Sequence, residues 1–277
     1  MTLYIYITYY LFILGMEQLS KNQLIARIKQ KKELSGLANS LVSDALEDYL
    51  KKYSIPLKNL RHPQEKIIIK EIRAELRNLA GRFQISLKKR LFLLEKGDIQ
   101  TLLKTHTSTA ERFDFYPKLK SLIKSLKINS ILDLGCGLNP LELASPRINY
   151  YASDINQFDL SLVKKFFEKH SLPGKIFLFD LRKTNALPTL PKADLCILFK
   201  VLDIIETKSH KLAKEIIEKL TCQYILISFA TRTLSGKPMS CKNRKWLETI
   251  LKILNYPYKI FSSNNEIFYL IRKDSLA

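Results

Sequence analysis

The sequence predicts an α/β fold in which a mostly parallel seven-stranded sheet with helices follows an all-helical N-terminal domain. Three observations predict it. From residue 130 onward, short apolar and β-branched segments alternate with helical ones, as in a parallel sheet covered by helices. From residue 17 to about 97, apolar residues instead recur at helical spacing. A glycine-rich turn directly follows the first β-branched segment, where open sheets bind ligands.

The helical region contains two long amphipathic segments. They are "LANSLVSDALEDYLKKY" (37–53) and "EKIIIKEIRAELRNLAGRF" (65–83), with breaks near Ile55-Pro56 and at "RHP" (61–63). We assign residues 16–105 to this domain and residues 106–277 to the sheet domain.

Residues 1–15, "MTLYIYITYYLFILG", form an uncharged apolar run. The run is shorter than the roughly 20 residues of a typical membrane span and lacks the positive start and cleavage site of a secretory signal. Met16 opens an ordinary amphipathic pattern, so we interpret residues 1–15 as an upstream extension. A membrane-associated segment is the alternative.

The sheet domain is predicted from its alternating segments, and the last two strands, joined by Asn264-Asn265, form a hairpin. Helices are expected over 158–170 and 210–220. The expected strands cover 130–135, 148–155, 175–181, 193–200, 224–230, 258–263 and 266–273.

The composition indicates a globular, strongly basic protein. The chain has 277 residues, 46% of them hydrophobic, and a formal net charge of +20. The electrostatic field of this charge favours binding to a polyanion, most commonly a nucleic acid. A high lysine content can also reflect background composition. The four cysteines are isolated and predict no zinc site or disulfide, which suits a reduced, cytoplasmic protein.

The glycine turn "ILDLGCGLNP" (131–140) indicates the cofactor. Pro140 stands where a dinucleotide fingerprint has its third glycine, which weakens an NAD-binding interpretation. Asp133, Gly135 and Gly137 instead give D-x-G-x-G, the first-strand loop of S-adenosylmethionine (SAM) methyltransferases. A plain surface turn is the alternative.

Polar residues also end the next three strands of the predicted sheet. Asp154 is placed to accept both ribose hydroxyls of SAM, and Asp180 with Leu181 to hold its adenine. Lys200 ends the fourth strand. Each aspartate could alternatively cap a turn.

The stretch "KTHTSTAERFDFY" (104–116) is densely polar at an expected helix start. Ser108 or Thr109 could cap the helix and Glu111 could reciprocate, but capping leaves His106 and Arg112 unexplained. A guanidinium near a SAM pocket is a natural partner for the methionine carboxylate.

Four ordered motifs resemble the 16S rRNA (guanine-N7) methyltransferases of the Arm, Rmt, Sgm and FmrO group, which modify guanine 1405 and confer aminoglycoside resistance. "HTSTAER" matches that family's H-A-S-T-x-E-R, and "LDLGCGLNPL" its L-D-[LI]-[GA]-C-G-L-N-P-L. "ILFKVLDIIE" matches a strand ending F-K-L-L-P-x-L-E, and "SFATRTLSGK" matches S-F-P-T-R-S-L-G-G-[RK]. The resemblance runs from about residue 46 to 272.

The resemblance implies a class I SAM-dependent methyltransferase fold and a set of cofactor contacts. These are Phe83, His106, Thr107, Ser108, Arg112, Gly135, Asp154, Asp180, Leu181 and Phe199, with Lys208 where the family has a glutamine. The sequence departs from the family at Asp203 and Ala230, both prolines there, and its 234–246 loop is two residues shorter and lacks a tyrosine.

N7 of guanine needs no general base, so catalysis reduces to alignment and electrostatics. Lys200 and Arg232 are the candidate substrate-side cations; the alternative for each is a structural ion pair. The resemblance implies a 30S ribosomal subunit as partner, with the helical domain docking RNA through basic residues such as Lys88, Lys89 and Arg90. We expect a monomer with no metal and no membrane. Alternatives are another rRNA or tRNA base, a small-molecule acceptor, or a non-catalytic SAM- or RNA-binding protein.

Overall fold

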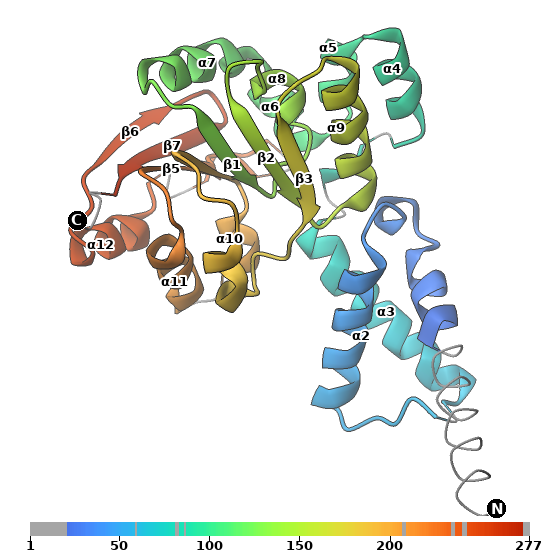
Figure 1. The fold of residues 1–277 in the computed structure, drawn as a ribbon. Helices are drawn as coiled ribbons and strands as arrows, with labels where there is room; N and C mark the ends of the chain where they lie inside the picture. The colour runs from blue at the N-terminus through green and yellow to red at the C-terminus, as the bar shows by residue number, and fades with distance from the viewer. Residues whose placement is uncertain are drawn as a thin grey trace, which may run out of the picture. The chain divides into compact units, whose positions relative to one another are not determined.

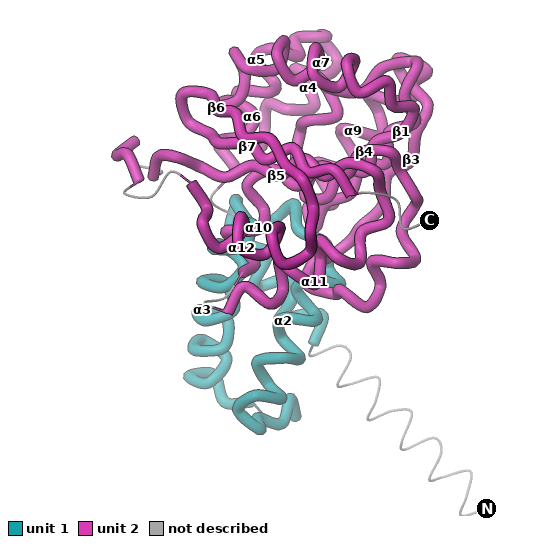
Figure 2. The backbone as a smooth tube through the Cα atoms, turned by 90° about the vertical axis from the view of Figure 1, so that its left-hand side faces the viewer, with its two compact units in different colours: residues 1–82 teal, residues 83–277 magenta. Residues whose placement is uncertain are grey.

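The computed structural model describes residues 21–58, 60–80, 83–85, 87–206, 209–233, 236–239 and 243–273, in two compact units. Unit 1 ends at Arg82 and unit 2 begins at Phe83 (Figure 2). The predicted extension over residues 1–15 lies outside the described residues, so it stays a prediction.

Unit 1 is helical, as predicted. Its elements are a helix over residues 21–29, a short 3₁₀ helix η1 (Lys32–Leu34), α2 (Asn39–Lys52) and α3 (His62–Leu79). The expected break between the two long helices is confirmed: α3 restarts with a proline in its first turn, and the Gln64 side chain accepts the Arg61 N–H at 3.1 Å. The apolar faces pack together through residues such as Ile28, Val42 and Ile72, which are fully buried.

Residues 83–105 belong to unit 2, whereas the sequence placed the boundary at 105/106. They form η3 (Leu87–Lys89), α4 (Arg90–Lys96) and α5 (Ile99–Leu103). Leu94 and Leu102 lie in the same apolar core as β1 and β2. Helical periodicity reveals that a face is buried but not which core covers it, and that is why the sequence misplaced this boundary.

Unit 2 is built on a seven-stranded sheet in the order β3-β2-β1-β4-β5-β7-β6 (Figure 1). The first five strands of the chain run parallel, and β7 pairs antiparallel with both β5 and β6. The predicted fold class and hairpin are confirmed. The strands are β1 (Ser130–Leu134), β2 (Asn149–Asp154), β3 (Gly174–Leu178), β4 (Leu195–Phe199), β5 (Tyr224–Ala230), β6 (Tyr258–Ser262) and β7 (Glu266–Arg272).

Helices cover both faces of the sheet (Figure 1). One face packs on α4, α5, α7 (Tyr116–Ser125), α8 (Pro140–Leu143) and α9 (Gln157–Lys169), and the other on α11 (Lys211–Lys219) and α12 (Lys245–Ile253). The remaining short helices are α6 (Thr107–Arg112), η4 (Phe113–Phe115), η5 (Thr184–Thr189) and α10 (Leu202–Ile205).

This topology places the site. The carboxyl ends of β1 to β5 meet at one edge, together with the start of β7, and the strand order reverses between β1 and β4. Open sheets bind ligands at such a reversal. Among the residues described, no helix has the length and apolar character needed to cross a membrane.

Candidate active site

The glycine turn after β1 is shaped for close approach. Gly135 and Gly137 have φ angles of 73° and 50°, in the left-handed region that favours glycine. The Gly135 N–H donates to Ser153 O at 2.8 Å, which ties the turn to β2. A Cβ on Gly137 would lie 3.0 Å from Cε1 of His106, so the predicted motif residues His106 and Gly137 pack directly together.

Asp154 ends β2 with its carboxylate already oriented. Its two oxygens accept the Gly137 and Asn156 N–H groups, each at 2.8 Å. Each carboxylate oxygen has a second lone pair, so Asp154 can still accept two hydroxyl groups, as the prediction for ribose requires. Burial, with the nearby charge of Asp159, raises the pKa of Asp154 to about 6.

Asp154→Asn is expected to weaken SAM binding by about 1.5–3 kcal/mol, the range for hydrogen bonds to a charged group. Because only the ionised carboxylate accepts both hydroxyls, wild-type affinity should also fall as pH drops through about 6. Burial raises the pKa of Asp133 to about 7, so Asp133 titrates in the same pH range. Any pH dependence that wild type shows and Asp154→Asn lacks is therefore due to Asp154. Calorimetry across this pH range measures both effects, and equal affinities at every pH would disprove the assignment.

Asp133 is fully buried in β1 and faces the interior of the sheet. The Tyr150 hydroxyl donates to its Oδ2 at 2.7 Å, while its Oδ1 has no partner among the described residues. Asp133 therefore holds the base of the glycine turn, and direct contact with a cofactor stays a prediction.

Asp180 and Leu181 follow β3 at the same edge of the sheet. Arg182 clasps the Asp180 carboxylate, with Nε to Oδ1 at 3.0 Å and Nη2 to Oδ2 at 2.7 Å. Leu181 is buried. The sequence did not anticipate the Arg182 pair, which occupies one face of the carboxylate proposed to hold adenine.

His106 directly precedes α6 and stacks on Phe83, with ring centroids 5.8 Å apart. Burial, with the positive charges of Arg90, Arg112 and Lys200, lowers the pKa of His106 to about 3, so the imidazole is neutral at physiological pH. Its Nδ1 is buried without a partner among the described residues. Thr107 donates through Oγ1 to Phe83 O at 3.4 Å, which joins the two predicted contact segments.

Arg112, the expected partner of the methionine carboxylate, is fully buried in a network of its own. Its Nε and Nη2 donate to the two carboxylate oxygens of Glu266 at 3.1 and 2.6 Å. Asn139 Oδ1 and Ser108 Oγ accept from it at 2.8 and 3.1 Å, and Phe199 lies under the guanidinium at 4.3 Å. The structure thus explains Asn139 of the glycine-turn motif as an Arg112 partner.

Glu266 is the residue that sequence reasoning missed. It is fully buried at the start of β7 and also accepts a hydrogen bond from the Ser228 hydroxyl. The available signal was its position at the start of the apolar run 266–271, which indicates that the glutamate is buried. A buried carboxylate requires a cationic partner.

Lys200 and Arg232, the two substrate-side candidates, lie in different surroundings. Lys200 follows β4 with φ of 56° and is buried; its ammonium pairs with Glu111 and lies 3.7 Å from Glu266. Arg232 is exposed, pairs with Pro238 in an isolated antiparallel bridge and donates to Gly236 O at 3.0 Å. Lys200 is thus engaged in an ion pair, and the substrate-side roles of Lys200 and Arg232 stay predictions. Lys208 lies outside the described residues.

Arg90 is not a surface residue, which corrects its expected role in docking. It is fully buried, pairs with Asp159 and donates to Thr105 Oγ1 at 2.8 Å and to the Thr105 carbonyl at 2.6 Å. Gln84 Nε2 also donates to Asp159, at 2.9 Å. This network fixes residues 84–105 on the first turn of α9, beside Asp154.

Both proline replacements contact Arg244, which precedes α12. The Arg244 guanidinium pairs with Asp203 at 2.6 Å and donates to the Ala230 carbonyl at 3.0 Å. These departures from the family pattern therefore form one local arrangement that anchors the start of α12 to α10 and to the end of β5.

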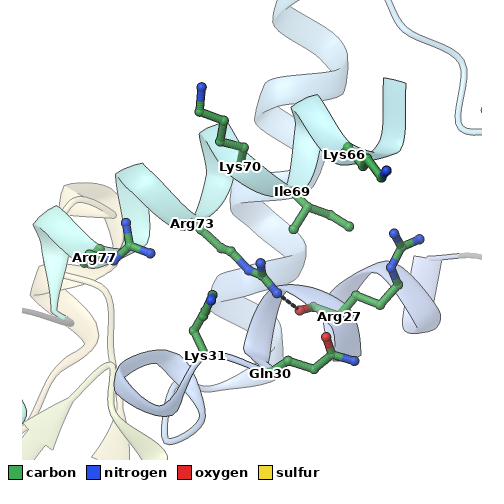
Figure 3. A pocket seen from close by; sticks show the side chains of 8 residues that line it. All are labelled: Arg27, Gln30, Lys31, Lys66, Ile69, Lys70, Arg73 and Arg77. Carbon is green, nitrogen blue, oxygen red and sulfur yellow. Dashed lines mark hydrogen bonds between the residues drawn. The ribbon is translucent and has the colours of Figure 1, made fainter. Parts of the chain in front are cut away.

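Unit 1 carries a separate basic pocket of about 360 Å³ between the 21–29 helix and α3 (Figure 3). Some of its cations are already engaged: Arg73 donates to the carbonyls of Arg27 and Ile28, and Arg27 and Arg77 pair with Glu65 and Glu33. The other three cations are exposed and make no ion pair with any residue the structure describes: Lys31, Lys66 and Lys70.

The strand order, the left-handed glycine turn and the oriented carboxylate of Asp154 define a class I SAM-dependent methyltransferase. The Asp154 carboxylate, oriented by the N–H of Gly137 in the glycine turn, retains acceptors for the ribose hydroxyls, so this site fits SAM. The family model described as "Ribosomal RNA methyltransferase (FmrO)" matches residues 94–249. The chain belongs to this FmrO family, as the motifs indicated, and is a SAM-dependent rRNA methyltransferase.

Similar proteins of known function support this family assignment. A 16S rRNA (guanine(1405)-N(7))-methyltransferase of Serratia marcescens is 29% identical over 220 residues, which cover 77% of this chain and 86% of the relative. The solved structure of the 16S rRNA methylase ArmA shares 27% identity and a TM-score of 0.54, covering 68% of this chain and 98% of ArmA. The methyltransferase RmtF, solved with S-adenosyl-L-homocysteine, has the same fold, with 22% identity, coverage of 92% and 98%, and a TM-score of 0.75.

Proposed function

We propose that this enzyme methylates N7 of guanine 1405 in 16S rRNA, within the assembled 30S subunit, and thereby confers aminoglycoside resistance. The observation that carries the proposal is the Serratia marcescens relative, a guanine-1405 N7 enzyme that matches 77% of the chain. The chemistry of the site supports the same acceptor.

The described residues suit an acceptor that needs no deprotonation. The pKa of His106, lowered to about 3, makes it a poor base, and the Lys200 side chain is already paired with Glu111. N7 of guanine attacks through a ring lone pair, so no proton has to leave first.

The mechanism is then one of alignment. When bound, SAM supplies an electrophilic methyl group on its sulfonium. Asp154 would hold the ribose beside the glycine turn, and the buried Arg112–Glu266 network fixes α6 against β7. Rate enhancement comes from holding donor carbon and acceptor nitrogen in line. This chemistry needs no Lewis acid, so we propose a metal-free, monomeric enzyme acting in the cytoplasm.

Unit 1 is proposed to dock the ribosomal RNA. Three exposed lysines of its basic pocket are suited to bind phosphate groups: Lys31, Lys66 and Lys70. Arg73 has a structural role, because its hydrogen bonds to the carbonyls of Arg27 and Ile28 hold the 21–29 helix on α3 (Figure 3). This assigns the docking role to the helical domain predicted from the sequence and names the cations that carry it.

The decisive measurement is the identity of the modified nucleotide. Incubation with labelled SAM and intact bacterial 30S subunits is expected to give a single 7-methylguanine at position 1405. Expression in a susceptible bacterium should then raise resistance to gentamicin and kanamycin and leave apramycin and neomycin-type drugs nearly unaffected. Apramycin resistance, or a methyl group on another base, would show that the short loop after β5 has changed the target.

A further inference from the structure

A second polar pocket, of about 190 Å³, lies at the end of β5 in unit 2. Its floor is the buried side chain of Ile267. Its polar lining comes from three segments that are far apart in the sequence: the end of β5, the start of α12 and the β6–β7 turn. These lining residues are Thr231, Arg232, Asn243, Ser262, Ser263 and Asn264.

Backbone hydrogen bonds frame this pocket. The Thr231 N–H donates to Asn265 O at 2.9 Å, which joins the end of β5 to the β6–β7 turn. The Met239 N–H donates to Thr231 O at 2.9 Å, which joins Met239 to the same residue. Main-chain bonds therefore hold the end of β5 to the β6–β7 turn, while the Arg244 side chain holds the start of α12 to the Ala230 carbonyl.

The chemistry of the lining selects its ligand. It combines one guanidinium with hydroxyl and amide groups, and no carboxylate is among the lining residues that the structure describes. A guanidinium binds phosphate oxygens, while hydroxyls and amides can donate to phosphate or pair with ribose hydroxyls. The lining therefore fits the sugar-phosphate backbone of a nucleic acid.

The pocket also lies where the acceptor strand must pass. The residues that fit SAM follow β1, β2 and β3, so the substrate approaches over the other half of the sheet, at β4, β5 and β7. Ile267 directly follows Glu266, and neighbouring side chains of a strand point to opposite faces. The pocket is thus one residue from the Glu266–Lys200 network, on the other face of β7.

We propose that this pocket binds a phosphate and ribose of the RNA strand beside the target base, with Asn243, Asn264 and the seryl hydroxyls as backbone contacts alongside Arg232. The inference rests on the proposed rRNA methylation and adds the residues that hold the strand in register. It assigns to the β6–β7 turn a role in substrate binding.

The test is steady-state methylation of 30S subunits by an Asn243→Ala/Asn264→Ala double variant of the full chain. Loss of two hydrogen bonds should raise KM for 30S about tenfold while kcat and SAM affinity stay within about twofold. Asn264→Asp should raise KM more than Asn264→Ala, because a carboxylate repels phosphate. Asn149→Ala, an exposed asparagine at the start of β2 on the opposite edge, is the matched control and should match wild type.

An unchanged KM in both the double variant and Asn264→Asp would overturn the inference while leaving the proposed function intact. A parallel loss of SAM affinity or of thermal stability would assign these residues a structural role and overturn it as well. Wild-type enzyme that fails to methylate 30S would instead refute the proposed function on which the inference depends.

Discussion

Glu266→Leu is expected to destabilise unit 2 by about 3–5 kcal/mol, the cost of breaking a buried ion pair by removing one partner. Arg112 would lose two carboxylate bonds and remain fully buried with its charge uncompensated. Urea denaturation followed by tryptophan fluorescence measures the change, because the chain's single tryptophan, Trp246, lies in α12 of unit 2.

The control lies in the same network. Glu111 pairs with Lys200 but its side chain is 33% exposed, so water can replace the lost carboxylate, and Glu111→Gln should cost no more than about 1 kcal/mol. A loss below about 1 kcal/mol for Glu266→Leu would mean that Arg112 finds other partners and that the network contributes little to stability.

Reversing the charge of Lys31, Lys66 and Lys70 to glutamate is expected to abolish methylation of 30S at low enzyme concentration. These exposed lysines make no ion pair with described residues, so reversal should leave unit 1 folded. Each lost phosphate contact should also lower the slope of log affinity against log salt by about 1, or about 3 for the triple variant. Filter binding of 30S at several salt concentrations measures this slope.

A matched triple reversal separates docking from net charge. Lys124, Lys175 and Lys192 are exposed near the starts of β1, β3 and β4, at the edge opposite the site, and their reversal changes the net charge equally. This control should retain near-normal 30S binding, and both triple variants should bind SAM normally. Equal loss of 30S binding in both triple variants would show that the lysines of unit 1 act only through the net positive charge of the protein.

Much of the fold followed from local patterns. The alternation of segments after residue 130 predicted all seven strands and the final hairpin, because strand and helix periodicities differ within a few residues. The boundary at Arg82/Phe83 did not follow, since the apolar faces of α4 and α5 look the same whichever core they join.

The candidate site was predictable to the extent that it rests on short motifs. Gly135, Gly137 and Asp154 lie as the D-x-G-x-G pattern and strand ends suggested. Pairings between distant residues could not be predicted: the apolar run after Glu266 indicates that this glutamate is buried, but Arg112 is far from it in sequence and nothing local identifies it as the partner. The buried position of Arg90, within a run of three basic residues, was hidden for the same reason.

The reversal of strand order between β1 and β4 has a pharmacological consequence. A compound that occupies only the side lined by Gly137 and Asp154 would meet groups that many SAM-using enzymes need for the same cosubstrate, so it would discriminate poorly among them. A compound that extends across β4 toward Arg232 would also meet the Arg244–Asp203 pair, in which Asp203 replaces the proline of the family motif. Selective inhibition, and with it restored aminoglycoside sensitivity, therefore requires a molecule that spans both sides of the reversal.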